Sequence, residues 1–445
     1  MTDVTLDKIV ALCKRRGFIY PGSEIYGGLS NSWDYGPLGV ELKNNIKKVW
    51  WKRFVQYRED IVGLDAALIM NPKVWEASGH LANFTDPLVE CKKCHSRFLA
   101  DHLGSENCPN CKDKGSFTDT KTFNLMFKTF IGPAEESSNI AYFRPETAQA
   151  IFVDFKNVLD TTRIKIPFGI AQIGKAFRNE ITPGNFLFRV REFEQMEIEY
   201  FFAPPKIDSD WQKKFDDWGI NVHQWIEDDL GLDPKKISEY EVPDPERAHY
   251  SKRTIDFMYE FPFGKEELYG LAYRGDFDLK SHQEASGQNL EYEDPETKEK
   301  YLPHVIEPSF GVDRSVLAIL LDAYNEQDGK VRLKLNSKLA PFKAAVFPLL
   351  ANKPELVNLA KKIYLDLMEN FMVTWDERGN IGGRYASQDE IGTPYCVTVD
   401  FQSLEDKTVT LRDRDSGQQI RVAISDLNTT LKEKIYGNRS KTNST

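Results

Sequence analysis

The chain has 445 residues and a mass of 51.2 kDa, which is too long for one hydrophobic core and predicts two or three domains. No apolar run reaches the ~20 residues of a membrane span, which excludes an integral membrane protein. The net charge of −10 argues against nucleic-acid binding through the whole surface, although a local basic face is enough to hold a phosphate backbone. The N-terminal sequence MTDVTLDKIVALCKRRGF is typical of an amphipathic helix and not of a signal peptide, so we expect a cytoplasmic protein.

The first 60 residues are predicted to be helical. In PLGVELKNNIKKVWWKRFV the apolar residues recur at the spacing of one helix face, which consists of Leu38, Leu42, Ile46, Val49 and Phe54. Strand-like runs follow from 123 to 202, and a mostly helical insertion is predicted at about 205–260. Further strands are predicted in LYGLAYRGDFDL and VIEPSFGVDR, and a buried helix in SVLAILLDAY.

A cysteine-rich segment at about 88–118 interrupts this pattern like a surface insertion. Its cysteines form CKKC and CPNC, which are Cys91, Cys94, Cys108 and Cys111. Two C-x-x-C pairs at this spacing are typical of a four-thiolate zinc site. Four thiolates leave no open coordination position, so we expect a structural Zn²⁺ ion. From the residues alone, a redox-active disulfide pair is the alternative.

After Asn336 a second series of elements begins, which predicts a separate domain at 339–445. KAAVFPLL, FMVTWDE, PYCVTVDF, TVTLRDR and QQIRVAI are strand-like, and ELVNLAKKIYLDLMEN is an amphipathic helix. Together they predict a compact α/β module. The polar tail GNRSKTNST is predicted to be disordered.

A charged hairpin is predicted within FRNEITPGNFLFRVREFEQMEIEYF, which runs from 177 to 201. Alternation places Gln195, Glu197 and Glu199 on one face of the second strand, and Glu194, Met196, Ile198, Tyr200 and Phe202 on the other. Arg178 and Glu180 share a face of the strand before, and T-P-G-N supplies the turn. Half-buried charges are costly unless they pair with one another or bind a charged ligand, and the residues alone leave both possibilities open.

Three segments resemble the signature motifs of the class II aminoacyl-tRNA synthetases, in the order of that class. The hairpin resembles the second motif, with Arg178 two residues before Glu180 and then Arg189-x-x-x-Phe193. GVDRSVLAIL, in which Arg314 opens a helix, resembles the third motif. The long N-terminal helix followed by IVGLDAALIMNPKVW, with Pro72, resembles the first motif, which builds the dimer interface in that class.

The resemblance implies an α+β fold with two domains. A class II catalytic domain at 1–338 would contain an antiparallel sheet flanked by helices, with a zinc-ribbon-like insertion at about 88–118 and the helical insertion at about 205–260. The module at 339–445 would be an α/β anticodon-binding domain that ends in the disordered tail.

Further stretches point to one subfamily. WDYGPLG, NPKVWEASGHLANFTDP, FNLMFKT, FRPETAQ, ELYGLAYRGDFDL, EPSFGVDR and RYASQDEIGTPYCVTVD resemble the bacterial-type homodimeric glycyl-tRNA synthetases over nearly the whole chain. The resemblance implies ATP-dependent attachment of glycine to tRNA(Gly) through a glycyl-adenylate, with Mg²⁺, a structural Zn²⁺ and a second copy of the chain as partners, and no membrane. The alternatives are another class II synthetase, prolyl above all, and a catalytically inactive synthetase-like accessory protein that binds nucleic acid.

The resemblance also implies roles for individual residues. Catalysis would rest on Arg178, Glu180, Arg189 and Arg314. These would bind ATP together with Asn179, Phe188, Val190, Arg191, Glu192, Phe193, Glu267, Leu268, Gly311, Val312 and Asp313, with Glu267 as a magnesium ligand. The glycine pocket would consist of Glu146, Phe193, Glu194, Gln195, Met196, Glu197, Arg274, Glu307, Ser309 and Gly311. In this pocket carboxylates would hold the ammonium group, and Arg274 would help to orient the carboxylate of glycine.

Some of these residues have a plainer interpretation. Glu146 could counter the dipole of a helix through TAQAIFVDF, and it could do so while binding substrate. Glu307 and Ser309 could belong to a capping loop ahead of the helix SVLAILL.

The sequence departs from the family pattern at three positions. Leu99 stands where an arginine is usual, so we expect one substrate contact to be missing unless Arg97 supplies it. Gly383 and Ser387 stand where arginines are common, so we expect some anticodon contacts to be weaker or relocated.

Overall fold

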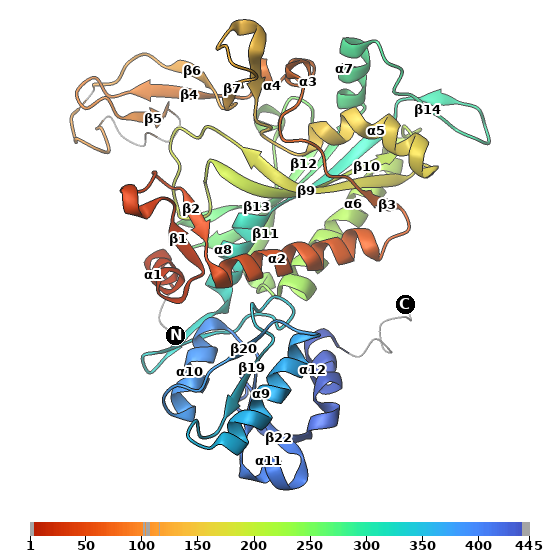
Figure 1. Ribbon diagram of the computed structural model, residues 1–445. Helices are drawn as coiled ribbons and strands as arrows, with labels where there is room; N and C mark the ends of the chain where they lie inside the picture. The colour runs from red at the N-terminus through yellow and green to blue at the C-terminus, as the bar shows by residue number, and fades with distance from the viewer. Residues whose placement is uncertain (1–3, 101–102, 104–106, 115, 438–445) are drawn as a thin grey trace.

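The computed structural model describes residues 4–100, 103, 107–114 and 116–437, and it shows a larger N-terminal body above a smaller C-terminal one (Figure 1). Among the described residues, none of the helices combines the length and apolarity that crossing a bilayer requires. The tail that is predicted to be disordered lies, from residue 438 on, outside the described residues.

A seven-stranded sheet forms the centre of the larger body. Its strands, in spatial order, are β11 (Ile237–Glu241), β12 (Arg253–Phe261), β13 (Gly264–Gly275), β16 (His304–Gly311), β10 (Glu192–Phe202), β9 (Phe168–Phe177) and β3 (Ile61–Gly63). All neighbours pair antiparallel except β3, which runs parallel to β9 at the edge. The predicted antiparallel sheet is thus confirmed.

Helices cover both faces of this sheet. On one face lie α1 (Leu6–Arg16), α2 (Pro37–Trp51), α6 (Asp208–Gln224), continued by the π-helical segment Trp225–Leu230, and α8 (Val312–Ala323). Their buried side chains pack with the sheet in the main core, where Trp50, Phe54 and Trp225 surround Phe310. On the other face lie α5 (Ala148–Thr162) and α7 (Phe277–Ser286), and Phe155 packs on Phe201 with ring centroids 4.6 Å apart (Figure 1).

The predicted alternation along β10 is confirmed, and it separates core from site. Met196, Ile198 and Phe202 are buried in the main core beneath α2 and α8. Glu197 and Glu199 point to the opposite face and are also buried. One strand therefore carries an apolar face against one helical layer and a charged face against the other.

Smaller elements surround this centre. The strands are β1 (Ile19–Pro21) with β2 (Trp33–Tyr35), β4 (Thr85–Glu90) with β5 (Arg97–Leu99) and β6 (Lys121–Asn124), β7 (Lys128–Phe130) with β8 (Ile140–Tyr142), β14 (Tyr292–Glu293) with β15 (Lys300–Tyr301), and β17 (Tyr324–Gln327) with β18 (Lys330–Leu333). The helices are α3 (Pro72–Ala77) and α4 (His80–Asn83). The sheet β5-β4-β6 carries the cysteine-rich segment and projects from the larger body (Figure 1).

The connection between β9 and β10 differs from the predicted tight hairpin. β9 ends at Phe177, and a loop from 178 to 191 replaces the four-residue turn, so Arg178 and Glu180 do not lie on the strand. The physical reason is that the loop has its own buried residues. Phe186 packs edge-on against Trp33 with ring centroids 4.7 Å apart, and this contact draws the chain away from the sheet.

The segment at 205–260 is helical only in its first half. α6 and its π-helical continuation end at Leu230, and then β11 and β12 join the central sheet as its edge, so the prediction of a mostly helical insertion is wrong for the second half. The reason lies in the period-two pattern of β12, which buries Ile255, Phe257, Tyr259 and Phe261 on one face.

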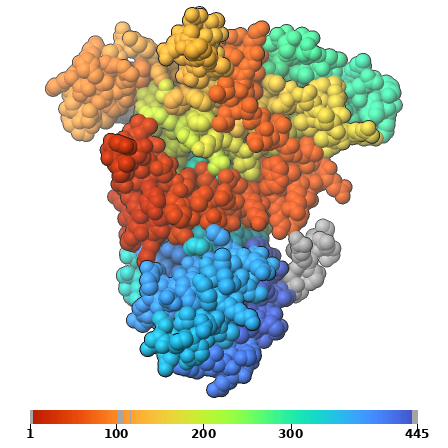
Figure 2. Space-filling view, viewed as in Figure 1, coloured from red at the N-terminus to blue at the C-terminus, as the bar shows by residue number. Residues whose placement is uncertain are grey.

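The C-terminal body is the predicted α/β module. Its sheet has the order β20 (Val373–Trp375), β19 (Ala344–Pro348), β21 (Tyr395–Val399), β22 (Thr408–Asp413) and β23 (Gln419–Ala423). Its helices are α9 (Pro354–Met368), α10 (Ile381–Ile391), α11 (Phe401–Asp406) and α12 (Leu427–Tyr436). Its core is separate from the main core, which ends at Ala340 while the other begins at Ala344. This packing supports the boundary that we predict near residue 338, and the module stands apart below the larger body in Figure 2.

Helix α2 passes very close to the N-terminal segment, and this contact needs a glycine. α2 begins with Pro37, whose fixed φ suits the first helical turn. A Cβ atom on Gly39 would lie 1.9 Å from the backbone oxygen of Phe18. No side-chain rotation relieves a clash with backbone.

Gly39→Ala is therefore expected to lower the free energy of unfolding by about 1–3 kcal/mol, the usual cost of overpacking. Gly219→Ala is the matched control, because Gly219 also lies inside a helix, α6, but its Cβ would meet nothing closer than Leu271 Cδ2 at 3.9 Å. Chemical denaturation of the full chain measures both variants. Equal stability of the two would contradict the close approach of α2.

Candidate active site

A cavity of about 620 Å³ opens between the charged face of the sheet and the loop that connects β9 to β10. It brings together most residues of the two predicted binding sets: Glu146, Arg178, Glu180, Phe188, Arg189, Val190, Phe193, Glu194, Gln195, Glu197, Glu267, Leu268, Glu307, Ser309, Gly311, Asp313 and Arg314. These residues come from segments up to 168 positions apart in the sequence, between Glu146 and Arg314. The fold thus assembles one site from the separate motifs.

The cavity lining does not include six predicted residues: Asn179, Arg191, Glu192, Met196, Arg274 and Val312. Met196 and Val312 are fully buried in the main core, on the other face of their elements. The side chain of Arg191 donates to the backbone oxygen of Ser30 at 3.1 Å. For Met196 the reason is the alternation along β10, which points its side chain to the main core.

Arginines cluster at one end of the cavity. The guanidinium of Arg178 lies between two aromatic rings, 5.3 Å from the centroid of Phe84 and 5.4 Å from that of Phe193, and its Nε donates to the backbone oxygen of Pro145 at 3.1 Å. Arg189, on the same loop, also lines this end. A guanidinium held in this way presents a planar, permanently charged group, which suits phosphate oxygens.

Arg314 is fixed at the start of α8. Its Nη1 donates to the backbone oxygen of Glu267 at 2.8 Å and pairs with the Glu267 carboxylate at 2.9 Å. Its guanidinium carbon lies 4.5 Å from the ring centroid of Phe188. A flat cation is thus held against the wall of the cavity, where it can stack on a planar ligand.

Asp256 is a site residue that the sequence interpretation missed. It lies on β12 opposite Gly270, beside the bulge that also brings in Glu267 on β13. A Cβ atom on Gly270 would lie 3.8 Å from Glu267 Oε1 and 4.0 Å from Asp256 Oδ1, so the two carboxylates converge on one spot. Only the register of β12 against β13 brings them together, and no sequence signal gives that register.

The pKa values of these two carboxyl groups diverge. Burial and the neighbouring Glu267 raise the pKa of Asp256 to about 7. Burial also acts to raise the pKa of Glu267, but Arg314, Arg178 and Arg189 outweigh it and hold the pKa below its usual value. Two converging carboxylates that repel one another are a donor set that fits a hard divalent cation, because such an ion relieves the repulsion with oxygen ligands.

Buried carboxylates cluster at the other end of the cavity. Glu197 accepts hydrogen bonds from the backbone amide of Thr147 at 2.9 Å and from the hydroxyl of Ser309 at 3.0 Å. Glu146 accepts from the side chain of Gln149 at 3.1 Å and lies 3.4 Å from the His80 ring nitrogen. Burial would raise the pKa of Glu146, but the charge and hydrogen bond of His80 lower it well below its usual value.

Arg274 lies behind this end and not in it. Its guanidinium is fully buried, pairs with Asp278 at 2.7 and 2.8 Å and with Glu307 at 2.9 Å, and lies 3.6 Å from the ring centroid of Tyr250. The donors of Arg274 thus hold protein carboxylates. The structure supports a role in fixing Glu307 and not the predicted contact with the carboxylate of glycine.

The pKa of Glu307 is shifted in the opposite direction from that of Glu146. Burial raises its pKa to about 8 against the pull of Arg274, with Glu197 and Glu146 adding to the rise. No motif points to the partners Asp278 and Tyr250, since both act through contacts that only the folded chain creates. The plainer interpretation of Glu307 and Ser309 as a capping loop is wrong, because both lie on strand β16.

The three departures from the family pattern lie in two parts of the structure. Leu99 lines the cavity, whereas Arg97 does not and pairs with Glu90 at 3.1 Å. Arg97 therefore does not stand in for the missing arginine. Gly383 and Ser387 lie on α10 of the C-terminal module.

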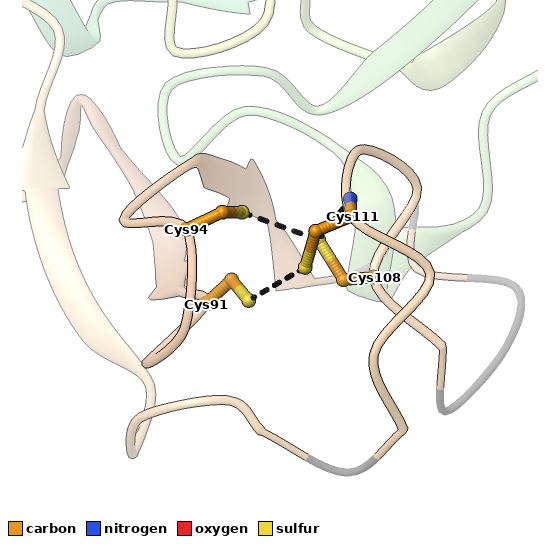
Figure 3. Close-up of side chains that lie close together, drawn as sticks. All are labelled: Cys91, Cys94, Cys108 and Cys111. Carbon is orange, nitrogen blue, oxygen red and sulfur yellow. Dashed lines mark hydrogen bonds between the residues drawn. The ribbon is translucent and has the colours of Figure 1, made fainter.

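The four cysteines of the insertion converge, as Figure 3 shows. All their sulfur atoms lie within 4.8 Å of one another, with Cys91 and Cys111 3.7 Å apart and Cys94 and Cys108 3.6 Å apart. These are free thiols, since a disulfide bond would bring two sulfurs to about 2 Å. The corners of a tetrahedron with metal–sulfur bonds of about 2.3 Å are about 3.8 Å apart, so the donor set fits a tetrahedral metal ion.

Comparison with known protein families assigns both parts of the chain. Residues 129–324 match the tRNA synthetase class II core domain (G, H, P, S and T), and residues 343–434 match the anticodon binding domain. These matches confirm the predicted fold class. The core match ends at residue 324 and the other begins at residue 343, so each match lies within the part of the chain that forms one of the two separate hydrophobic cores.

Curated relatives match over nearly their whole length. The glycine–tRNA ligase of Alkaliphilus oremlandii is 54% identical over 98% of this chain and 99% of its own. Those of Geobacillus thermodenitrificans and Borreliella burgdorferi are 52% and 51% identical, over 97% of this chain and 98% of each relative. The resemblance that the motifs indicated is confirmed: the chain belongs to the glycine–tRNA ligase family and has the class II synthetase core.

Proposed function

We propose that this protein activates glycine with ATP and attaches it to tRNA(Gly) through a glycyl-adenylate. The observation that carries the proposal is one cavity with arginines at one end and buried carboxylates at the other. Such a cavity matches a substrate pair of a polyanion and a small molecule with an ammonium group. The relatives, all glycine–tRNA ligases, favour this function over a prolyl enzyme. An inactive accessory protein is disfavoured because Arg178, Arg189 and Arg314 are all present and face the cavity.

The arginine end is assigned to ATP. Arg178 would hold the α-phosphate, and Arg189 the γ-phosphate. Phe193 and the guanidinium of Arg314 would cover the two faces of adenine, and aromatic stacking on a base is worth ~1–3 kcal/mol. Glu267 and Asp256 would hold a Mg²⁺ ion, which neutralises phosphate charge when bound.

The carboxylate end is assigned to glycine. Glu146, Glu197 and Glu307 would surround the ammonium group, and each is already fixed by protein partners. In the first step a carboxylate oxygen of glycine attacks the α-phosphorus and pyrophosphate leaves. In the second step the terminal ribose hydroxyl of tRNA attacks the carbonyl carbon and AMP leaves. Neither step needs a nucleophilic side chain, so catalysis comes from positioning and from charge stabilisation by the arginines.

Two further assignments follow from the domains. The module at 343–434 would bind the anticodon of tRNA(Gly), in keeping with the family that it matches. We place the protein in the cytoplasm, where tRNA is charged and where cysteines such as Cys91 and Cys111 stay reduced.

The activation step can be measured without tRNA. ATP–pyrophosphate exchange without tRNA is expected with glycine and with none of the other standard amino acids. Arg178→Ala is expected to reduce this exchange by about 100- to 1000-fold, the usual effect of removing one group that stabilises developing charge. Arg378→Ala is the control, since Arg378 is an arginine of the C-terminal module with a side chain that is 90% exposed. Exchange with proline in place of glycine would overturn the assigned specificity.

We propose that the cysteine cluster binds one structural Zn²⁺ ion per chain. Elemental analysis of protein purified without chelator is expected to find one zinc per chain, and Cys108→Ser is expected to lose it. Cys396→Ser is the matched control, because Cys396 is equally buried but lies in the C-terminal core, outside the cluster. Zinc-free protein with full activity and stability would reject the assignment.

We propose that the protein is a homodimer. The segment after β1 exposes Ile25 and Tyr26, each 87% accessible, and Leu29, 64% accessible, and such an apolar group suits a protein interface. Sedimentation velocity is expected to give twice the chain mass of 51.2 kDa. The double variant Ile25→Asp with Tyr26→Asp is expected to shift the protein toward the mass of one chain. Ile420→Asp, a change at an exposed residue of β23, should not have this effect.

A further inference from the structure

Glu199 is a buried carboxyl group to which neither the motifs nor the proposed reaction assigns a role. It lies on β10 two residues after Glu197 and on the same face of the sheet, and its side chain is fully buried. Among the described residues, neither of its carboxyl oxygens has a hydrogen-bond partner. Its neighbours in the site differ in this respect: Glu146, Glu197, Asp278 and Glu307 all accept hydrogen bonds or pair with a cation.

The charges around Glu199 are mostly negative. They are Glu197 on its own strand, Glu307 on β16, Asp278 on α7 and, as the cation, Arg274 on β13. All three nitrogen atoms of the Arg274 guanidinium already donate hydrogen bonds to other carboxylates, Nε and Nη2 to Asp278 and Nη1 to Glu307. A buried carboxylate without a donor, beside other carboxylates, is far more costly than the neutral acid. Burial, and next the charge of Glu307, accordingly raise the pKa of Glu199 well above its usual value.

The strand register sets Glu199 directly against Glu307. β10 pairs with β16 through Glu197 opposite Ser309 and Tyr200 opposite Ile306, so residue 199 stands opposite residue 307. Directly opposed residues of antiparallel strands have Cβ atoms about 4.5–5.5 Å apart, within reach of two glutamate side chains. A protonated carboxyl group carries one O–H donor, and the group opposite it is an acceptor once it is ionised.

We propose that Glu199 is a positioning residue that acts through Glu307: it remains a neutral acid, and its O–H group stabilises the Glu307 carboxylate when the ammonium group of glycine arrives. The inference rests on the proposed function of the cavity. The proton balance is simple, since Glu307 passes from the acid to the carboxylate on binding, its proton goes to solvent, and Glu199 keeps its own. Glycine binding is then linked to the release of one proton.

The linkage predicts the sign of a pH effect. Burial raises the pKa of Glu307 to about 8, so below that pH only a fraction of the free enzyme has the ionised form that receives the ammonium group. The apparent affinity for a ligand falls in proportion to the competent fraction. The KM for glycine in ATP–pyrophosphate exchange is therefore expected to fall about tenfold between pH 6 and pH 7 and to level off above pH 8. The KM for ATP should not follow this profile.

Two substitutions of Glu199 separate the effect of its hydrogen-bond donor from the effect of its size. Glu199→Leu removes the O–H group, so Glu307 ionises at higher pH. We expect a KM for glycine that is about tenfold higher at pH 7, with kcat at saturating glycine unchanged. Glu199→Gln keeps a neutral donor of similar size and is expected to stay within about twofold of the unaltered protein. Glu260→Gln is the control, since Glu260 is an exposed glutamate of β12 outside the cavity.

Three results would overturn the proposal: a KM for glycine that does not change between pH 6 and pH 8, Glu199→Leu with the profile of the unaltered protein, or Glu199→Gln as impaired as Glu199→Leu. Thermal melting of each variant shows whether it is folded, and the pH profile of the unaltered protein decides the linkage on its own. If no amino acid supports exchange, the proposed function fails. Exchange with glycine and a flat profile leave that function standing and remove only the role of Glu199.

Discussion

The pairing of Arg274 with Asp278 and Glu307 is the interaction on which the carboxylate end of the cavity depends. Without this buried cation, the carboxylate of Asp278, and that of Glu307 once it is ionised, would have no positive partner in a setting that water does not screen. Removing one partner of such a pair typically costs 3–5 kcal/mol, because the other charge is left buried. Tyr250 covers the guanidinium and keeps water from it. The cluster thus remains anionic enough to receive a cation and stable enough to stay folded.

The central sheet makes this arrangement possible because one of its faces packs in the main core and the other lines the cavity. Every second residue of β10 packs in the main core, and the residues between them, such as Glu197, face the cavity. α5 and α7 close the charged face, and α7 supplies Asp278 while the segment before α5 supplies Thr147. The cost of burying charge is therefore offset by donors that belong to the covering layer.

The sequence was informative wherever a motif fixes a residue by local spacing. Arg178, Arg189, Phe193 and Arg314 line one cavity and the four cysteines form one cluster, and short motifs specify both sets. A continuous stretch of a motif includes residues that lie outside the cavity, such as Met196, whose side chain the strand geometry points into the main core. The sequence could not predict the roles of Asp256, Asp278 and Tyr250. Nor could it predict that Glu199 has no hydrogen-bond partner among the described residues. Each depends on strand register or on helix packing between segments that are far apart in the chain.

The two ends of the cavity differ in the elements that carry their side chains, and this difference fits the two ligands that we propose. Glu197, Glu307 and Ser309 lie on neighbouring strands, which hold side chains to small tolerances, and glycine is too small to offer many contacts of its own. Arg178 and Arg189 lie on the loop from 178 to 191, where backbone can adjust around a larger, flexible triphosphate. With the ligands that we propose, a rigid pocket for glycine and an adaptable one for ATP would fix the carboxylate of glycine relative to the α-phosphate. That relative position is what in-line attack requires.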